Sequence, residues 1–284
     1  MRALADFVMR GPVQAAGVAV AGAIIPLMFW ISAAVVSLVL LRLGIQRGVQ
    51  VGLWALLPAL GWASFGNDPI AFLVLVEALV MATVLRLSQS WERTLLAGVL
   101  VALASGILMP LVMSDIIGEL ARAGVTLYEQ VNPQLASEAG DTLFGMMQSL
   151  MVMSLSVSLM MMALGSLMLA RGWQAQLYNP GGFRREFHAL RLSKPMLLGC
   201  LAGMFLLPGL GLNPVLTSTL FVFPLVVAAI ALIHGLLGTQ ANGRFWLILF
   251  YVALLMFGPT LLPLLLILAI VDSWLDFRAR VRQD

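Results

Sequence analysis

The chain has 284 residues, of which 61% are hydrophobic and 10% are charged. A soluble domain carries about 25% charged residues, so this composition excludes a soluble globular protein. The net charge of +3 does not indicate nucleic-acid binding, because the basic residues lie at the ends of apolar segments, where they set membrane topology. The apolar blocks approach the roughly 20 residues that cross a bilayer core as a helix, which predicts an all-α integral membrane protein.

The first apolar block runs from Val13 to Leu41. As one helix it would be about 43 Å long, more than an untilted crossing needs. Pro26 lies near its middle, and proline breaks the helical hydrogen-bond ladder. The block therefore forms either two short helices, at about 13–25 and 27–42, or one kinked helix. We expect the split.

The rest of the chain alternates between apolar runs and short polar segments. The expected spans lie at about 49–64, 70–86, 95–113, 143–170, 196–211, 215–237 and 245–271. The acidic segment 114–142 is too polar to span and predicts a short amphipathic helix at the membrane interface. Gly258-Pro259 and Pro263 interrupt the last run, so it crosses the membrane either once or twice. We expect about eight to ten apolar helices in one polytopic bundle.

The polar segments differ in charge and so predict an orientation. Segments 42–48, 86–93, 171–195 and 238–244 carry bases, whereas segments 65–69 and 114–142 carry acids. Because Lys and Arg resist translocation, the loop 171–195 is expected in the cytoplasm and the loop 114–142 outside an inner (cytoplasmic) membrane. Both termini bear arginine and should also be inside. That requires the first and last blocks each to cross twice or re-enter; single crossings would place both termini outside and give eight spans.

Glu77 lies near the middle of the span 70–86. A charged carboxylate costs several kcal/mol at that depth, so an intramembrane acid is a functional candidate by default. It could bind a cation or relay a proton as part of a small-molecule or ion site. Alternatively, it is a protonated acid that bonds to a neighbouring helix.

His234, four residues before Gly238, is the second candidate for a substrate or ion site. Near the cytoplasmic interface its imidazole could titrate around neutrality. The alternative is a histidine that caps its helix or bonds to a neighbour. No sequence pattern pairs it with Glu77.

Two further features predict contact surfaces. Ala15, Ala19 and Ala23 recur one helical turn apart, and small residues at that spacing let helices approach closely, within the chain or with a partner protein. The loop that follows Tyr178 combines a strong turn signal with Arg184 and Arg185, which could meet lipid phosphates or a cytosolic partner, or simply be solvated.

Cofactor and metal signals are weak. The single cysteine cannot complete a zinc site, and the span 143–170 has eight methionines but neither Cys nor His to build a copper path. Phosphate-binding, paired-histidine and nucleophile-elbow motifs are absent from the sequence. We therefore expect no enzyme activity, no cofactor and no bound metal.

Several motifs resemble the YybS-like family of predicted membrane proteins. They are Asn179-Pro180-Gly181-Gly182-Phe183 with Glu186-Phe187 and Leu190-Arg191-Leu192, Ile233-His234-Gly235-Leu236-Leu237, Trp246-Leu247 with Tyr251, and Asp272-Ser273-Trp274-Leu275-Asp276-Phe277-Arg278. The resemblance implies a polytopic helical membrane protein. It implies no particular activity, because the family has none that is agreed.

The start of the chain also resembles the S-components of energy-coupling-factor transporters. The similar features are a small-residue helix, the turn at Pro26, a helix at 31–41, the turn Arg42–Gly48 and a helix at 49–64. In that family an alanine face on the first helix docks to the energising subunit, and Ala15, Ala19 and Ala23 are the matching positions. The helices after residue 195 depart from the S-component pattern.

These observations predict one transmembrane domain over residues 1–284. It would comprise an S-component-like six-helix part at 13–171, a cytoplasmic loop at 172–195 and further helices at 196–284. The leading hypothesis is a transporter-like protein that binds a small solute among its helices and is energised by a partner subunit or an ion gradient. The alternative is a non-catalytic scaffold or accessory subunit that binds a protein partner. In either case the chain contacts membrane lipid.

Overall fold

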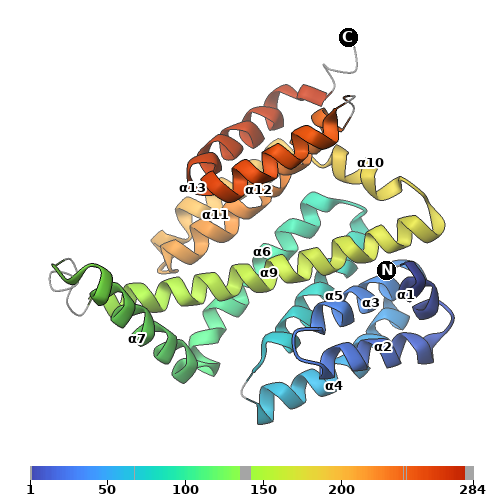
Figure 1. Cartoon of the computed structure of the whole chain (residues 1–284), viewed down its shortest axis with the longest axis horizontal. Helices are drawn as coiled ribbons and strands as arrows, with labels where there is room; N and C mark the ends of the chain where they lie inside the picture. The colour runs from blue at the N-terminus through green and yellow to red at the C-terminus, as the bar shows by residue number, and fades with distance from the viewer. Residues whose placement is uncertain (1, 67, 135–141, 239, 241, 279–284) are drawn as a thin grey trace.

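The computed structural model describes the chain except for residues 1, 67, 135–141, 239, 241 and 279–284. In the described residues all regular secondary structure is helical (Figure 1). The elements are α1 (Arg2–Val8), α2 (Pro12–Ile24), α3 (Phe29–Leu43), α4 (Ile45–Phe65), α5 (Ile70–Ser88), α6 (Trp91–Val112), α7 (Ser114–Val131), α9 (Thr142–Tyr178), α10 (Gly182–Ala189), α11 (Lys194–Leu206), the 3-10 turn η1 (Pro208–Leu210), α12 (Pro214–Leu237) and α13 (Gly243–Leu275).

Six of the described helices are long and apolar enough to cross a membrane: α4, α5, α6, α9, α12 and α13. The predicted all-α polytopic bundle is therefore confirmed. The bent pair α10 and α11 meets at 65° and could form a seventh, broken span. Two of the acids in the predicted segment 114–142, Glu138 and Asp141, lie outside the described residues.

The first apolar block divides at Pro26, as predicted. Helix α2 ends at Ile24 and α3 begins at Phe29, and Leu27 between them has a positive φ of 64°. α3 then becomes the centre of the bundle, with every residue from Ser32 to Leu41 buried. α2, α4, α5 and α9 surround it. A helix that is apolar on all sides is stable only when other helices cover every face, and α3 meets that condition.

α9 is much longer than the predicted span 143–170. Its 37 residues extend over about 55 Å, so it exceeds the roughly 30 Å bilayer core. The segment predicted as a loop from residue 171 is therefore helical up to Tyr178 and again in α10. The extra length arises because neither Gly172 nor the polar residues after it are strong enough helix breakers to stop a helix of apolar residues. At the other end of α9, the amphipathic helix α7 packs alongside it and both project from the bundle (Figure 1).

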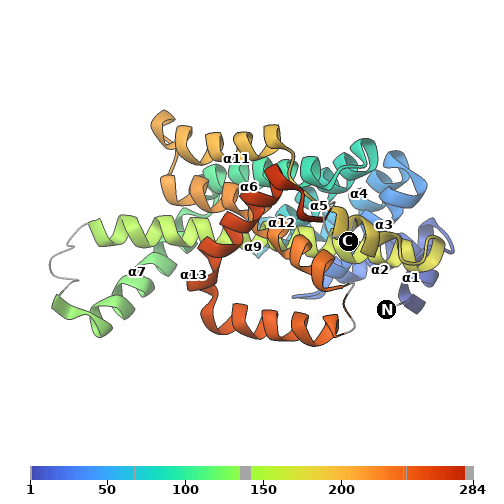
Figure 2. The ribbon, with the colours of Figure 1, turned by 90° about the horizontal axis from the view of Figure 1, so that it is seen from above.

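The last apolar block turns back on itself. Phe257, just before Gly258-Pro259, leaves the helical region with φ −125° and ψ 23°. The two halves of α13 run in different directions from this break (Figure 2). The start of α13 lies near Gly238, which accepts a hydrogen bond from Arg184, while Asp276 after its end forms an ion pair with Arg191. Both ends of α13 therefore lie beside α10.

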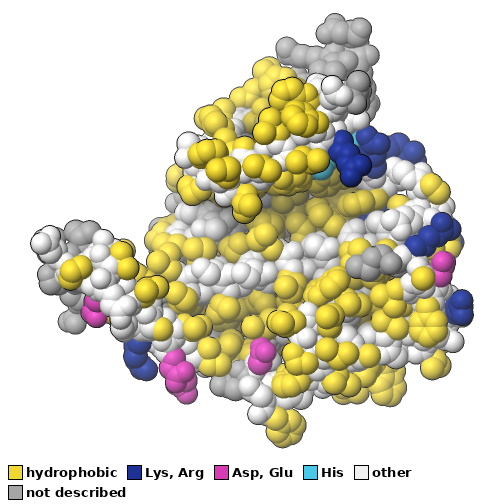
Figure 3. Space-filling model, viewed as in Figure 1, with side chains coloured by type: hydrophobic (Ala, Val, Ile, Leu, Met, Phe, Trp, Pro, Cys, Tyr) yellow, Lys and Arg dark blue, Asp and Glu magenta, His cyan; other side chains and the backbone are white. Residues whose placement is uncertain are grey.

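Helix α1 and the end of α13 lie at one end of the bundle, which we call the α10 end. α1 packs on α9, and the residue after α13 pairs with the segment between α10 and α11. Lys and Arg side chains gather toward this end on the face shown in Figure 3, while acidic side chains lie mostly along the opposite edge. The expected membrane side of the termini and basic loops stays a prediction.

Candidate functional site

Glu77 lies in the interior of the bundle on α5. Its side chain is 1% exposed, and its neighbours on the same face, Val74, Ala78 and Met81, are each 0% exposed. α5 packs against α3, α4, α6 and α9, so helices enclose this part of the span. The carboxyl group is thus held within a candidate membrane span and away from both water and lipid.

One oxygen of the Glu77 carboxyl group, Oε1, is buried without a hydrogen-bond partner in the described part of the chain. The other buried acid, Asp272, differs because its Oδ1 accepts the main-chain N–H of Phe277 at 3.1 Å and its Oδ2 lies 3.7 Å from Arg278. An anion at Glu77 would be uncompensated, so the group must carry a proton or receive a cation.

The helices around Glu77 pack very closely. A Cβ atom built on Gly98 of α6 would lie 3.0 Å from Met81 Cε on α5 and 3.4 Å from Met160 Cε on α9. Met81 is one helical turn from Glu77, so the three helices converge next to the carboxyl group. On the neighbouring α3, the buried Ser37 Oγ also has no hydrogen-bond partner among the described residues. Because Glu77 is closed off, an ion can reach it only if these helices move apart.

The structure places His234 away from Glu77, near the C-terminal end of α12. Its Nε2 lies 2.7 Å from the Tyr251 hydroxyl of α13. Its ring makes an edge contact with Phe187 at 5.5 Å between centroids and lies 6.2 Å from the ring of His188. His234 therefore joins α10, α12 and α13, and it does not share a site with Glu77.

Arg184 and Arg185 contact the chain itself. Arg184 Nη2 donates to the main-chain oxygen of Gly238 at 2.8 Å, which fastens α10 to the end of α12. Arg185 Nη2 donates to Asn179 Oδ1 at 3.5 Å, within the turn that precedes α10. Both residues remain exposed, but Arg184 already has a structural role.

The predicted alanine face packs inside the chain. Ala15, Ala19 and Ala23 are 2%, 0% and 2% exposed. The Ser32 hydroxyl of α3 donates to the main-chain oxygen of Ala19 at 2.6 Å, which requires the two backbones to lie close together. The face thus serves close packing of α2 against α3 in this structure.

Sequence reasoning missed a polar cluster around α10. Besides His234, the cluster contains His188, Tyr251, Asp272 and Arg278. Its members pack closely around Gly235, because a Cβ on that residue would lie 3.1 Å from the main-chain oxygen of His188 and 3.4 Å from Arg278 Nε. Burial, followed by Arg184, His234 and Arg278, lowers the pKa of His188. The motifs quoted for the YybS-like resemblance contain nearly all of these residues, and that was the available signal.

No group of three metal-ligating side chains occurs among the described residues. Comparison with protein-family models, curated protein sequences and solved structures finds no match to this chain.

Proposed function

We propose that this protein is a membrane carrier in which Glu77 is the exchange site for a proton or a monovalent cation. One observation carries the proposal: a carboxyl group within a membrane span is 1% exposed, and its Oε1 has no partner among the described residues. A purely structural acid is expected to bond to a neighbour, as Asp272 does. Glu77 therefore weakens the bundle, and a functional role explains its presence.

The carrier hypothesis also explains why helices enclose Glu77 in this structure. A buried acid that alternately loses and regains a proton couples its charge to the opening of the helices around it. The close approach of α5, α6 and α9 at Gly98 is the contact that has to open. A small solute could follow the same opening, energised by the ion gradient or by a partner subunit. In the proposed orientation, the α10 end faces the cytoplasm.

The alternative of a scaffold that binds a partner through α10 has weaker support. Arg184, one of the two arginines expected to hold the partner, is hydrogen-bonded to Gly238 of the same chain. In addition, a scaffold gives no reason for an unpartnered acid inside the bundle. We therefore favour the carrier.

The test is ion exchange in proteoliposomes. The full chain is reconstituted with a pH-sensitive dye inside, and a Na⁺ or K⁺ gradient is imposed. We expect the wild type to change the internal pH in response to one of the two gradients. Glu77→Gln should reduce that rate by about tenfold or more, because it removes the only carboxyl group of α5.

Asp272→Asn is the matched control, because it neutralises the other buried acid among the described residues, and that acid already has hydrogen-bond and ion-pair partners. It should lower stability while leaving the exchange rate per folded protein near that of the wild type. Equal rates for wild type and Glu77→Gln, or wild-type vesicles that behave like empty ones, would contradict the exchange role. Native mass spectrometry of the same preparation would identify a retained solute or a stoichiometric protein partner.

A further inference from the structure

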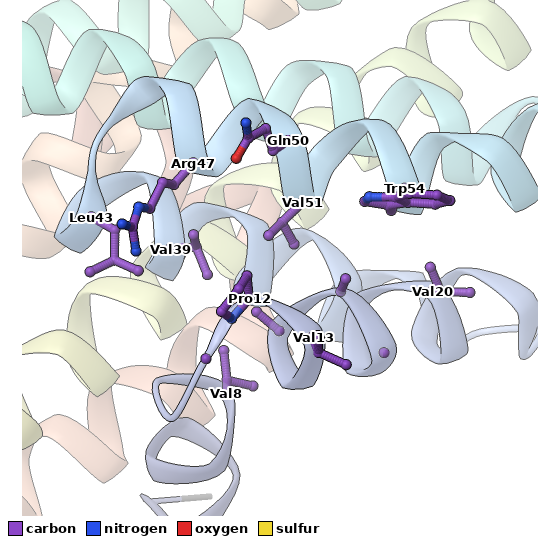
Figure 4. A pocket seen from close by; sticks show the side chains of 14 residues that line it. Val8, Pro12, Val13, Val20, Val39, Leu43, Arg47, Gln50, Val51 and Trp54 are labelled. Carbon is purple, nitrogen blue, oxygen red and sulfur yellow. The ribbon is translucent and has the colours of Figure 1, made fainter.

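A groove with a volume of about 840 Å³ opens between α2 and α4, with α3 as its floor (Figure 4). Its walls are mainly apolar: Val13 and Val20 of α2 face Val51 and Trp54 of α4 across it. Val13 is 78% exposed and Trp54 is 58% exposed. Because α4 is a candidate membrane span, this exposed apolar surface would face lipid rather than water.

The middle of the groove is open because of Gly17. No atom lies within 4 Å of the position that a Cβ on Gly17 would occupy. Together with Ala16, this residue makes α2 flat where it borders the groove. A hydrocarbon chain can lie along such a surface, whereas a large side chain at residue 17 would fill the space.

One end of the groove is cationic. Arg47 and Gln50 line it there, and Figure 4 shows the Arg47 side chain beside Leu43, at the opposite end from Val20 and Trp54. Arg47 is exposed and has no ion pair among the described residues. It lies in the first turn of α4, where the N-cap residue Gly44 supplies no side-chain hydrogen bond, so free main-chain N–H groups add to the positive potential.

We propose that this groove is a binding site for an anionic phospholipid. One acyl chain lies between α2 and α4 past Gly17 and Trp54, and the phosphate lies at Arg47. The apolar walls match the chain, and the unpaired guanidinium and helix N-terminus match the anionic headgroup. Arg42, in the last turn of α3, stacks on the ring of Tyr178 at the end of α9, so the turn that leads into α4 and Arg47 lies at the α10 end. The phosphate would therefore lie at the depth of a membrane interface. This site is separate from Glu77 and does not depend on the carrier proposal.

The test measures lipid retention by the full chain. The protein is purified from nanodiscs that contain equal amounts of phosphatidylglycerol and phosphatidylcholine, and bound lipid is counted by native mass spectrometry. We expect one retained phosphatidylglycerol per wild-type chain. Arg47→Gln should lower its retention about tenfold, because the charge-assisted contact to phosphate is lost. Gly17→Leu should abolish retention by filling the groove.

Two matched controls separate the groove from general effects. Arg93→Gln removes an exposed arginine from the equivalent place in the first turn of α6, and Gly165→Leu adds a side chain at an exposed, open position on α9. Both variants should retain lipid as the wild type does. Thermal unfolding of each variant checks that it is folded. If Gly17→Leu is unstable, Arg47→Lys supplies a second test, because it keeps the positive charge and should retain most of the lipid that Arg47→Gln loses.

Three outcomes would overturn the proposal. The first is equal retention of the two lipids by the wild type, which would show that charge does not select the occupant. The second is unchanged retention in folded Gly17→Leu, which would place the lipid elsewhere. The third is evidence for a different occupant of the groove, seen either as displacement of the lipid by inorganic phosphate alone or as a dimer that Gly17→Leu disrupts.

Discussion

Arg171 on α9 binds Glu186 on α10 through two hydrogen bonds. Its Nε donates to Oε2 at 2.9 Å, and its Nη2 donates to Oε1. The side chains are 20% and 32% exposed, so the pair is partly shielded from water. Nη1 of the same guanidinium also donates to Gln174, and Gln174 donates to the main-chain oxygen of Leu41 at 3.4 Å. This chain of contacts links α10 through α9 to the buried helix α3.

We expect a double-mutant cycle on Arg171→Gln and Glu186→Gln to give a coupling energy of about 1 to 3 kcal/mol, because a bidentate charge-assisted pair with limited exposure is among the stronger ion pairs. Unfolding by SDS titration in mixed micelles supplies the free energies. The Arg191–Asp276 pair is the control, since its side chains are 31% and 43% exposed. It should couple by about 0 to 1 kcal/mol. A larger coupling for the control pair would contradict the ranking.

Removing the Glu77 carboxyl group should stabilise the fold. In Glu77→Met an apolar side chain of similar length replaces a buried group whose Oε1 has no partner among the described residues. The free energy of unfolding should rise by about 1 to 3 kcal/mol. Asp272→Asn should have the opposite effect by about the same amount, because it leaves Arg278 buried without its anionic neighbour. Loss of stability in Glu77→Met would indicate a bonded, structural acid.

Two glycines on α4 should respond oppositely to alanine. A Cβ on Gly48 would lie 2.4 Å from Leu40 Cβ and 2.6 Å from Leu40 Cα, so Gly48→Ala must push α3 and α4 apart. A loss of about 1 to 3 kcal/mol follows. Gly61 has no atom within 4 Å of its Cβ position, so Gly61→Ala should be neutral or stabilise by up to about 1 kcal/mol through helix propensity. Thermal unfolding of the two variants under one condition provides the comparison.

Acidification should loosen the contact between α10 and α12. Burial, the cations Arg184 and Arg278, and His234 lower the pKa of His188, so the folded state binds fewer protons there than the unfolded state. The contribution of neutral His188 to the free energy of unfolding is fully present above its unfolded-state pKa of about 6.5. That contribution is lost as the pH falls from about 6.5 toward the lower pKa of His188 in the folded state.

The unfolding midpoint should therefore fall more between about pH 7.5 and 5.5 for the wild type than for His188→Gln, which cannot titrate at this position. Other groups contribute equally to both proteins, so the difference isolates His188. A parallel decrease in the two proteins would show that its protonation is not coupled to folding.

Cysteine labelling should place both chain ends on one side of the membrane. Cys200 is the single cysteine of the sequence and is 1% exposed, so Cys200→Ala gives a clean background. We expect Arg10→Cys and Phe277→Cys to react with a membrane-impermeant reagent from the same side as Arg185→Cys. Asp68→Cys and Glu119→Cys should react from the other side. Labelling of Arg10→Cys together with Asp68→Cys would contradict the expectation that the first apolar block returns to the side on which it begins.

Local sequence pattern was enough to identify a helical membrane protein and to locate most of its helices. Long apolar runs are local properties, so hydropathy located the spans, and Pro26 divided the first block where the structure divides it. The arginines at the segment ends also predict that both termini share a side with the basic loops, which the labelling experiment tests. The predicted end of the span at residue 170 was about two turns too early, because no strong helix breaker separates residue 170 from Tyr178, where α9 ends.

Which apolar surfaces pack against each other and which are left to face lipid depends on how the helices pack. Bundle-facing and lipid-facing side chains are equally apolar, so composition could not show that α3 is buried on every side or that a groove lies beside Gly17. The sequence placed Glu77 in a span, but the side chains of α3, α6 and α9 leave its Oε1 without a partner among the described residues. Contacts such as Arg171–Glu186 and His234–Tyr251 likewise arise from helix packing between distant segments, which no local pattern encodes.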